Sequence, residues 1–240
     1  MILEIIYHAL GFLIIVGMVI VAIKFFVNYK YTGQKELLAG IIFAIGFLAG
    51  LVYLSFLFLF QVFGLDISVD DRTFLFINFG FVFLVMLSWF YIFYQFLYPN
   101  SNTVKILFYI LVGINIVWEL FFFYIIFFST ISFKIARIIV FIYNMCALSI
   151  TGALVLILAI KSLMSKDKIL KYRGLFLLIG FLLGGGSLVI DDGIFNLELA
   201  ILDIIARVAL IIGIFLIFFG FFMTEESRLY KFLFERKKEE

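Results

Sequence analysis

Seven long apolar runs, separated by short segments that hold most of the charged residues, constrain this chain more than any other feature of its sequence. A hydrocarbon core about 30 Å thick is crossed by about 20 residues of α-helix. We place the runs at residues 5–27, 37–64, 73–98, 104–128, 135–160, 174–190 and 197–223. None alternates polar and apolar residues over the roughly ten positions of a barrel strand. The sequence therefore predicts an all-α integral membrane protein, a seven-transmembrane-helix bundle.

Composition supports the same interpretation, because 66% of the residues are hydrophobic and only 14% are charged. A soluble domain carries about 25% charged residues, so the excess apolar surface here is expected to face a lipid bilayer. The connecting segments are too short for a soluble domain, and we expect no nucleic-acid partner. A single cysteine, Cys146, and a single histidine, His8, argue against an internal disulfide and against a histidine-rich metal site.

The distribution of basic residues predicts the orientation. Lys and Arg gather on the cytoplasmic side of membrane proteins. If the N-terminus lies outside, only Arg72, Lys134 and Arg137 fall on the outer side, while Arg207 lies within a span. We therefore expect a multi-pass protein of the cell membrane, with its N-terminus outside and its C-terminus in the cytoplasm.

Two basic segments stand out on the predicted cytoplasmic side. They run from Lys161 to Arg173 and from Ser227 to Lys238, the second within a basic amphipathic tail over residues 224–240. Such a tail is typical of an interfacial helix whose basic groups face anionic lipid. Anchorage is one interpretation, and docking of a cytoplasmic signalling partner at the two segments is the other. The sequence does not indicate an oligomeric state.

Three ionisable residues are expected at membrane depth, where an unpaired charge is costly and marks a candidate site. Asp203 and Arg207 lie one helical turn apart in the seventh run, and Glu119 lies in the fourth. At about 1.5 Å per residue, Glu119 and Arg207 differ in depth by only about 6 Å. A Glu119–Asp203–Arg207 cluster could therefore bind a ligand or act in gating. The alternative is an Asp203–Arg207 pair that only holds the bundle in register.

Weaker candidates surround these three. Asn115 shares a helix face with Glu119, and Asn144 lies in the fifth run; such groups form interhelical hydrogen bonds or line ligand sites. Paired outer carboxylates could hold Ca²⁺ if their loops met, although spaced oxygen ligands are more usual. These carboxylates are Asp70, Asp71, Asp191 and Asp192. We predict no resident metal and no cofactor.

Two G-x-x-x-G motifs, at residues 46–50 and 180–184, predict close approach of neighbouring helices. The glycine run that continues over residues 184–186 is not a phosphate loop, because the Lys and Ser/Thr of that motif are absent.

Residues 202–208, Leu-Asp-Ile-Ile-Ala-Arg-Val, resemble the last helix of microbial rhodopsins, in which a Lys at the position of Arg207 carries retinal. Arginine cannot form that Schiff base, so the resemblance does not imply retinal. Residues 28–35 and 204–214 resemble parts of the seven-helix sensory regions that precede kinase domains in archaea and bacteria. That resemblance implies a receptor-like or sensory protein without its own kinase. Residues 45–50 and 179–184 also resemble each other, as in small transporters built from repeats.

Two functions follow as hypotheses. The first is a receptor-like or sensory membrane protein that signals through a cytoplasmic partner. The alternative is a small-solute transporter or channel that uses the intramembrane Glu, Asp and Arg residues. An enzyme is a weaker hypothesis, because nothing resembles a nucleophile–base pair or a metal site.

Overall fold

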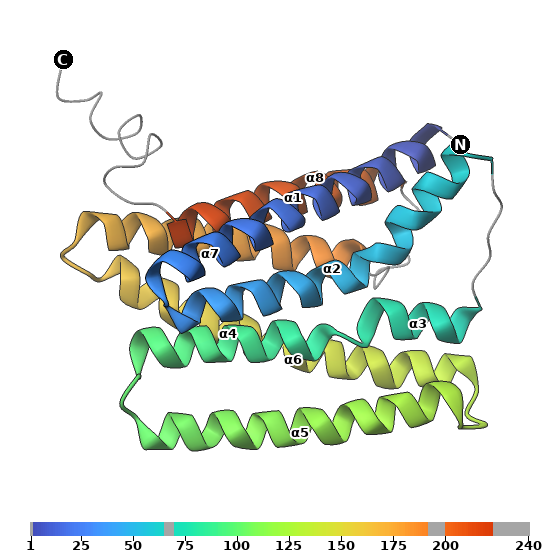
Figure 1. The fold of residues 1–240 in the computed structure, drawn as a ribbon. Coiled ribbons are helices and arrows are strands. Elements are labelled where there is room, and N and C mark those ends of the chain that lie inside the picture. The colour runs from blue at the N-terminus through green and yellow to red at the C-terminus, as the bar shows by residue number, and fades with distance from the viewer. Residues whose placement is uncertain (1, 65–69, 192–199, 223–240) are drawn as a thin grey trace, which may run out of the picture. The chain divides into compact units, whose positions relative to one another are not determined.

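The computed structural model describes residues 2–64, 70–191 and 200–222, and helix is the regular secondary structure of these residues (Figure 1). They form eight helices, namely α1 (Ile2–Thr32), α2 (Lys35–Val62), α3 (Asp71–Phe79), α4 (Val82–Leu97), α5 (Asn102–Phe127), α6 (Phe133–Leu163), α7 (Lys168–Asp191) and α8 (Ala200–Phe222).

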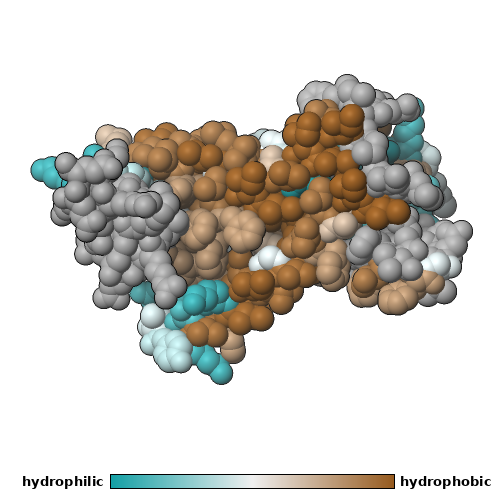
Figure 2. All heavy atoms as spheres, turned by 90° about the horizontal axis from the view of Figure 1, so that it is seen from above, coloured by the Kyte–Doolittle hydropathy of each residue, from teal (hydrophilic) through white to brown (hydrophobic). Residues whose placement is uncertain are grey.

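Six helical segments of the described residues are long and apolar enough to cross a membrane. These are Ile5–Thr32, Asp71–Leu97, Asn102–Phe127, Phe133–Leu163, Lys168–Leu188 and Ile201–Phe222, with α3 and α4 together making the second. The protein is therefore an all-α, multi-pass membrane protein. Its surface is suited to contact with lipid, since large apolar side chains of α5 such as Val117 and Leu120 are 67% and 68% exposed. Hydrophobic residues also dominate the middle of the face drawn in Figure 2.

The third apolar run differs from the single helix expected over residues 73–98. α3 ends at Phe79 and α4 begins at Val82, with Gly80 and Phe81 between them. The amide of Gly80 still donates to Phe76, but Phe81 has left helical geometry, with φ −117° and ψ 4°. Glycine is a weak helix former and a common position for a kink, which accounts for the break.

Several connections are shorter than the sequence suggested, because the helices continue beyond the apolar runs. α1 extends to Thr32, and Gly33 ends it with a positive φ of 68°, so that α2 begins at Lys35. α6 continues to Leu163 and α7 begins at Lys168, so much of the basic segment from Lys161 to Arg173 is helical. A helix can continue past the hydrocarbon core, because its i to i−4 backbone hydrogen bonds form in water as well as in lipid. Hydropathy shows only where the chain leaves the hydrocarbon, so it underestimates the length of the helix.

The chain divides into two compact units, Met1–Leu154 and Val155–Glu240, with the division inside α6. In the first unit, α2 packs against α1, α3 and α4, and α5 packs against α3 and α4. Gly46 allows the close approach of α2 to α4, since a Cβ there would lie 2.9 Å from the Cβ of Leu84. A core cluster joins α3, α5 and α6 through buried side chains, namely Leu75, Phe122, Ile126 and Val140.

In the second unit, α7 packs along α8 at two glycines. A Cβ on Gly213 would lie 2.8 Å from the carbonyl oxygen of Gly180 and 2.8 Å from the amide nitrogen of Gly184. Both glycines of the motif at residues 180–184 therefore face Gly213, and the backbones of α7 and α8 come into close contact there. The expected packing role of this motif is confirmed.

Candidate functional site

The hairpin of α5 and α6 brings polar side chains from two helices together inside the first unit. Residues 128–132 connect the two helices. At about 1.5 Å per residue, Glu119 lies about 12 Å before the end of α5, and Tyr143 lies about 15 Å after the start of α6. Both residues are therefore nearer to the connected end of the hairpin than to its open end.

Asn115 and Tyr143 form the central contact of this hairpin. The Tyr143 hydroxyl donates to Oδ1 of Asn115 at 2.5 Å, and Nδ2 of Asn115 donates to the backbone carbonyl of Leu111 at 2.7 Å. Asn115 is only 1% exposed. Its amide therefore has both its acceptor and a donor engaged, which fixes the orientation of the side chain.

The indole of Trp118 stacks on the face of the Tyr143 ring. The two rings are nearly parallel, at 8°, with their centroids 4.1 Å apart. Trp118 in turn packs against the core cluster of α3, α5 and α6. Tyr143 is thus fixed both by its hydroxyl and by its ring, so this part of the hairpin is preorganised.

Two buried acceptor atoms of α5 and α6 have no hydrogen-bond partner within the part of the chain that the structure describes. They are Oε1 of Glu119 and Oδ1 of Asn144, both buried. Glu119 is close enough to Tyr143 for the two to interact electrostatically, and Asn144 is 7% exposed. Buried polar atoms without partners are rare, so these two indicate a place for a hydrogen-bond donor. We call Asn115, Trp118, Glu119, Tyr143 and Asn144 the α5–α6 site.

Arg207 and Asp203 lie on α8, in the second unit. The Arg207 side chain is fully buried and Asp203 is partly buried, and both take part in polar or other non-covalent interactions. Glu119 belongs to the first unit. The Glu119–Asp203–Arg207 cluster therefore stays a prediction.

The packing of α7 on α8 suggests how a buried arginine is accommodated. Gly180 lies opposite Gly213, and Gly184 lies against Leu210. Continued along this antiparallel register, the glycine run and Ser187 come level with Arg207.

Asp70, one of the four acidic residues of the predicted Ca²⁺ site, has a local role. Asp70 is the N-cap of α3, and its Oδ1 accepts from the amides of Arg72 and Thr73, each at 3.1 Å. The hydrogen bond from the Thr73 side chain, with those from the two amides, lowers the pKa of Asp70 from its ordinary value of 3.8. Residues 2–64, 70–191 and 200–222 hold no group of three or more side chains suited to a metal ion.

Two of the predictions fall on residues that the structure does not describe. Asp192, part of the predicted outer Ca²⁺ site with Asp70, Asp71 and Asp191, lies outside the described residues, as does the segment from Ser227 to Lys238. Both the outer site and the tail therefore stay predictions.

Sequence reasoning missed Trp118, and it noted Tyr143 only as a polar neighbour of Asn144, not as a candidate residue. In a chain with 20% aromatic residues, one Trp or Tyr does not differ visibly from its neighbours. The available signal was spacing: Trp118 lies three residues after Asn115, on nearly the same helix face.

The sequence was compared with protein-family models and with curated proteins, and neither comparison gave a match.

Proposed function

We propose that this chain is a receptor-like or sensory seven-helix protein of the cell membrane that signals through a cytoplasmic partner. The observation that carries the proposal is the α5–α6 site, where Glu119 leaves a buried acceptor atom close to the Asn115–Tyr143 contact and Asn144, next to Tyr143 in the chain, leaves a second. The apolar helix α2, 28 residues long, supplies the seventh span of this proposal. The N-terminus then lies outside and the C-terminus in the cytoplasm, as the basic residues favour.

The position of the site favours a receptor over a transporter. A receptor needs a binding site accessible from one side, whereas a transporter needs a polar path that reaches both sides. Glu119 lies about 12 Å from the connected end of the hairpin, which is the outer end in the proposed orientation. Trp118 and Tyr143 stack there as a fixed wall rather than a moving gate.

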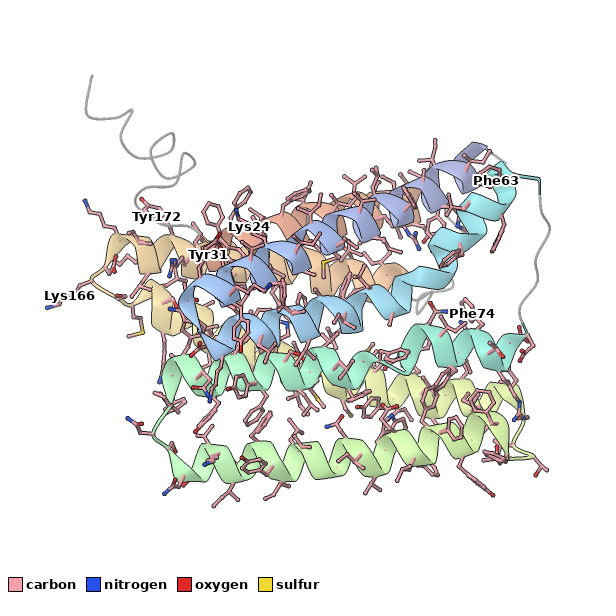
Figure 3. All side chains as sticks on the ribbon, viewed as in Figure 1. Lys24, Tyr31, Phe63, Phe74, Lys166 and Tyr172 are labelled. Atoms are coloured by element: carbon pink, nitrogen blue, oxygen red, sulfur yellow. The ribbon has the colours of Figure 1, made fainter. Side chains whose placement is uncertain are left out.

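The α6–α7 connection and the start of α7 offer a surface for the partner. The side chains of Lys166, in the connection, and of Lys168 and Lys171, in the first turn of α7, are exposed, and Figure 3 shows Lys166 pointing away from the helices. In the proposed orientation this basic surface lies in the cytoplasm. It would attract an acidic protein surface as well as anionic lipid.

The orientation is tested by labelling single cysteines in intact cells with a membrane-impermeant maleimide. With Cys146→Ser as background, Ser132→Cys reports the α5–α6 connection and Ser165→Cys reports the α6–α7 connection. We expect labelling of Ser132→Cys in intact cells and of Ser165→Cys only after permeabilisation. The reverse pattern would show that the proposed orientation is wrong.

The signalling function is tested by recovering the partner from cross-linked membranes. A charge-reversed variant with Lys166→Glu, Lys168→Glu and Lys171→Glu should lose the partner. Glu119→Gln should change the amount recovered, because a receptor couples its binding site to its distant cytoplasmic face. If the wild type, the charge-reversed variant and Glu119→Gln all recover the same amount of partner, the proposal is contradicted.

A transporter is the second candidate, and the full burial of Arg207 in α8 favours it. Ionisable residues at membrane depth often mark a solute path. Solute flux into proteoliposomes that Glu119→Gln abolishes would support the transporter and contradict the receptor.

A further inference from the structure

We propose that the α5–α6 site binds a small molecule bearing a protonated amine, with Glu119 as the counter-ion of the ammonium group. This inference deepens the proposed receptor function and rests on it. It names the class of ligand that the polar atoms on α5 and α6 select.

The first step is to count which hydrogen-bonding atoms of the site are already engaged. Asn115 accepts a hydrogen bond from Tyr143 and donates one to the carbonyl of Leu111. The only hydrogen of the Tyr143 hydroxyl is therefore already donated to Asn115. Among the residues of the site, the buried atoms without a partner in the described part of the chain are Oε1 of Glu119 and Oδ1 of Asn144. Both of them are acceptors, so the site selects a donor.

The second step is charge. A carboxylate or phosphate ligand would bring a second negative charge next to the Glu119 carboxylate, and this repulsion makes binding costly in a weakly polar environment. An ammonium group instead supplies several N–H donors and a charge opposite to that of Glu119. The ligand is therefore a cation rather than an anion.

The third step separates an organic ammonium from a metal ion. A hard cation such as Ca²⁺ takes six or more oxygen ligands. The described residues hold no cluster of three or more metal-ligating side chains, here or elsewhere. Trp118 precedes Glu119 in the chain, and its indole lies parallel to the Tyr143 ring. Apolar aromatic groups beside a carboxylate suit the carbon skeleton of an organic ammonium better than a hydrated metal ion.

The fourth step is access. Glu119 is partly exposed although its Oε1 atom is buried, and Trp118 is partly exposed as well. The site lies in the half of the hairpin nearer to residues 128–132, the outer end in the proposed orientation. An amine would therefore enter from outside the cell.

The fluorescence of Trp118 provides a direct test. The chain has two tryptophans, so Trp89→Phe leaves Trp118 as the single reporter. Trp89 lies on α4, where it contacts Phe43 edge-to-face, and Phe preserves an aromatic ring there. The variant, in lipid nanodiscs, is titrated with primary amines from methylammonium to phenethylammonium. The alcohol and the carboxylate of the same carbon skeleton serve as matched probes.

We expect a saturable change in Trp118 emission with at least one amine and none with its matched alcohol or carboxylate. Glu119→Gln should weaken amine binding at least tenfold. Glu36→Gln, which removes a carboxylate from the first turn of α2, should leave it unchanged. The same amine should raise the thermal unfolding temperature of the Glu36→Gln protein but not of Glu119→Gln.

Three results would overturn the inference. They are no saturable response to any amine of the series, an equal response to the matched alcohol, or equal amine affinity in Glu119→Gln. The experiments distinguish failure of this inference from failure of the proposed receptor function. If Glu119→Gln changes partner recovery but no amine binds, the ligand class is wrong and the receptor stands. If an amine binds but is also carried into proteoliposomes, the amine site stands and the receptor is wrong.

Discussion

Arg72 donates a hydrogen bond from Nη2 to the backbone carbonyl of Ile131, with 2.6 Å between nitrogen and oxygen. Its Nη1 atom donates to three further carbonyls, those of Ile125, Ile126 and Ser129, at 3.3, 3.1 and 3.0 Å. The last carbonyls of a helix have no partner within the helix, and its C-terminus carries a partial negative charge. A guanidinium from the first turn of α3 therefore closes the end of α5. This explains what the Arg72 side chain does.

Arg72→Met should destabilise the protein. The substitution keeps much of the side-chain volume but removes every donor, so the carbonyls of the α5 terminus lose their charged partner. Hydrogen bonds to a charged group contribute about 1.5–3 kcal/mol, and we expect a loss of about 2 kcal/mol. Thermal unfolding in a mild detergent measures it. Arg137→Met, at an exposed position in the first turns of α6, is the control and should have little effect. Equal losses in the two variants would mean that Arg72 does not cap α5.

Tyr143→Phe should destabilise the α5–α6 hairpin by a smaller amount. The ring still stacks on Trp118, but Oδ1 of Asn115 loses its donor. Side-chain hydrogen bonds inside membrane proteins contribute about 0.6 kcal/mol on average, so we expect a loss of about 1 kcal/mol or less. The matched control is Tyr124→Phe, at a position of α5 that is 56% exposed. If removing the Tyr143 hydroxyl has no more effect than removing that of Tyr124, the Asn115 contact contributes nothing to stability.

The apolar runs predicted where helices lie, because hydrocarbon forces a spanning segment to satisfy its backbone internally, but they did not predict the break between α3 and α4. The motif at residues 180–184 also predicted a close helix contact, since glycine has no side chain to keep two helices apart. Both are local properties of the chain.

The Arg72 cap and the Asn115–Tyr143 contact are not local. They join positions that are 53 to 59 and 28 residues apart, and the partners of Arg72 are backbone carbonyls, which every residue has. Hydropathy gives the length of a span but not the face that it turns to a neighbour. Glu119 and Asn144 were predicted as candidates because polar groups are rare in such runs, whereas their aromatic neighbours were hidden among many others.

Gly213→Ala should separate α7 from α8. In an open helix position alanine gains up to about 1 kcal/mol over glycine. Here the new Cβ would lie 2.8 Å from the backbone of both Gly180 and Gly184, which cannot rotate away. Overpacking of this kind costs about 1–3 kcal/mol, so the net effect is a loss of stability. Thermal unfolding measures it.

Gly113→Ala is the matched control for this substitution, since a Cβ at Gly113 would meet nothing within 4 Å. It should leave stability unchanged or raise it. If Gly213→Ala is as stable as Gly113→Ala, the close contact between α7 and α8 does not exist in the membrane.

Asp70 gives the N-terminal end of α3 a defined response to pH. Hydrogen bonds from the Thr73 side chain and from the amides of Thr73 and Arg72 hold the pKa of Asp70 below 3.8 in the folded protein. The cap therefore contributes its full stability above about pH 4, and this is lost as the pH falls through the lower folded pKa. Unfolding temperatures between pH 6 and pH 3 should fall more steeply for the wild type than for Asp70→Asn. Thr73→Val, which removes the side-chain donor but keeps the carboxylate, should give an intermediate slope. Parallel curves for all three proteins would show that the Asp70 carboxylate does not stabilise α3.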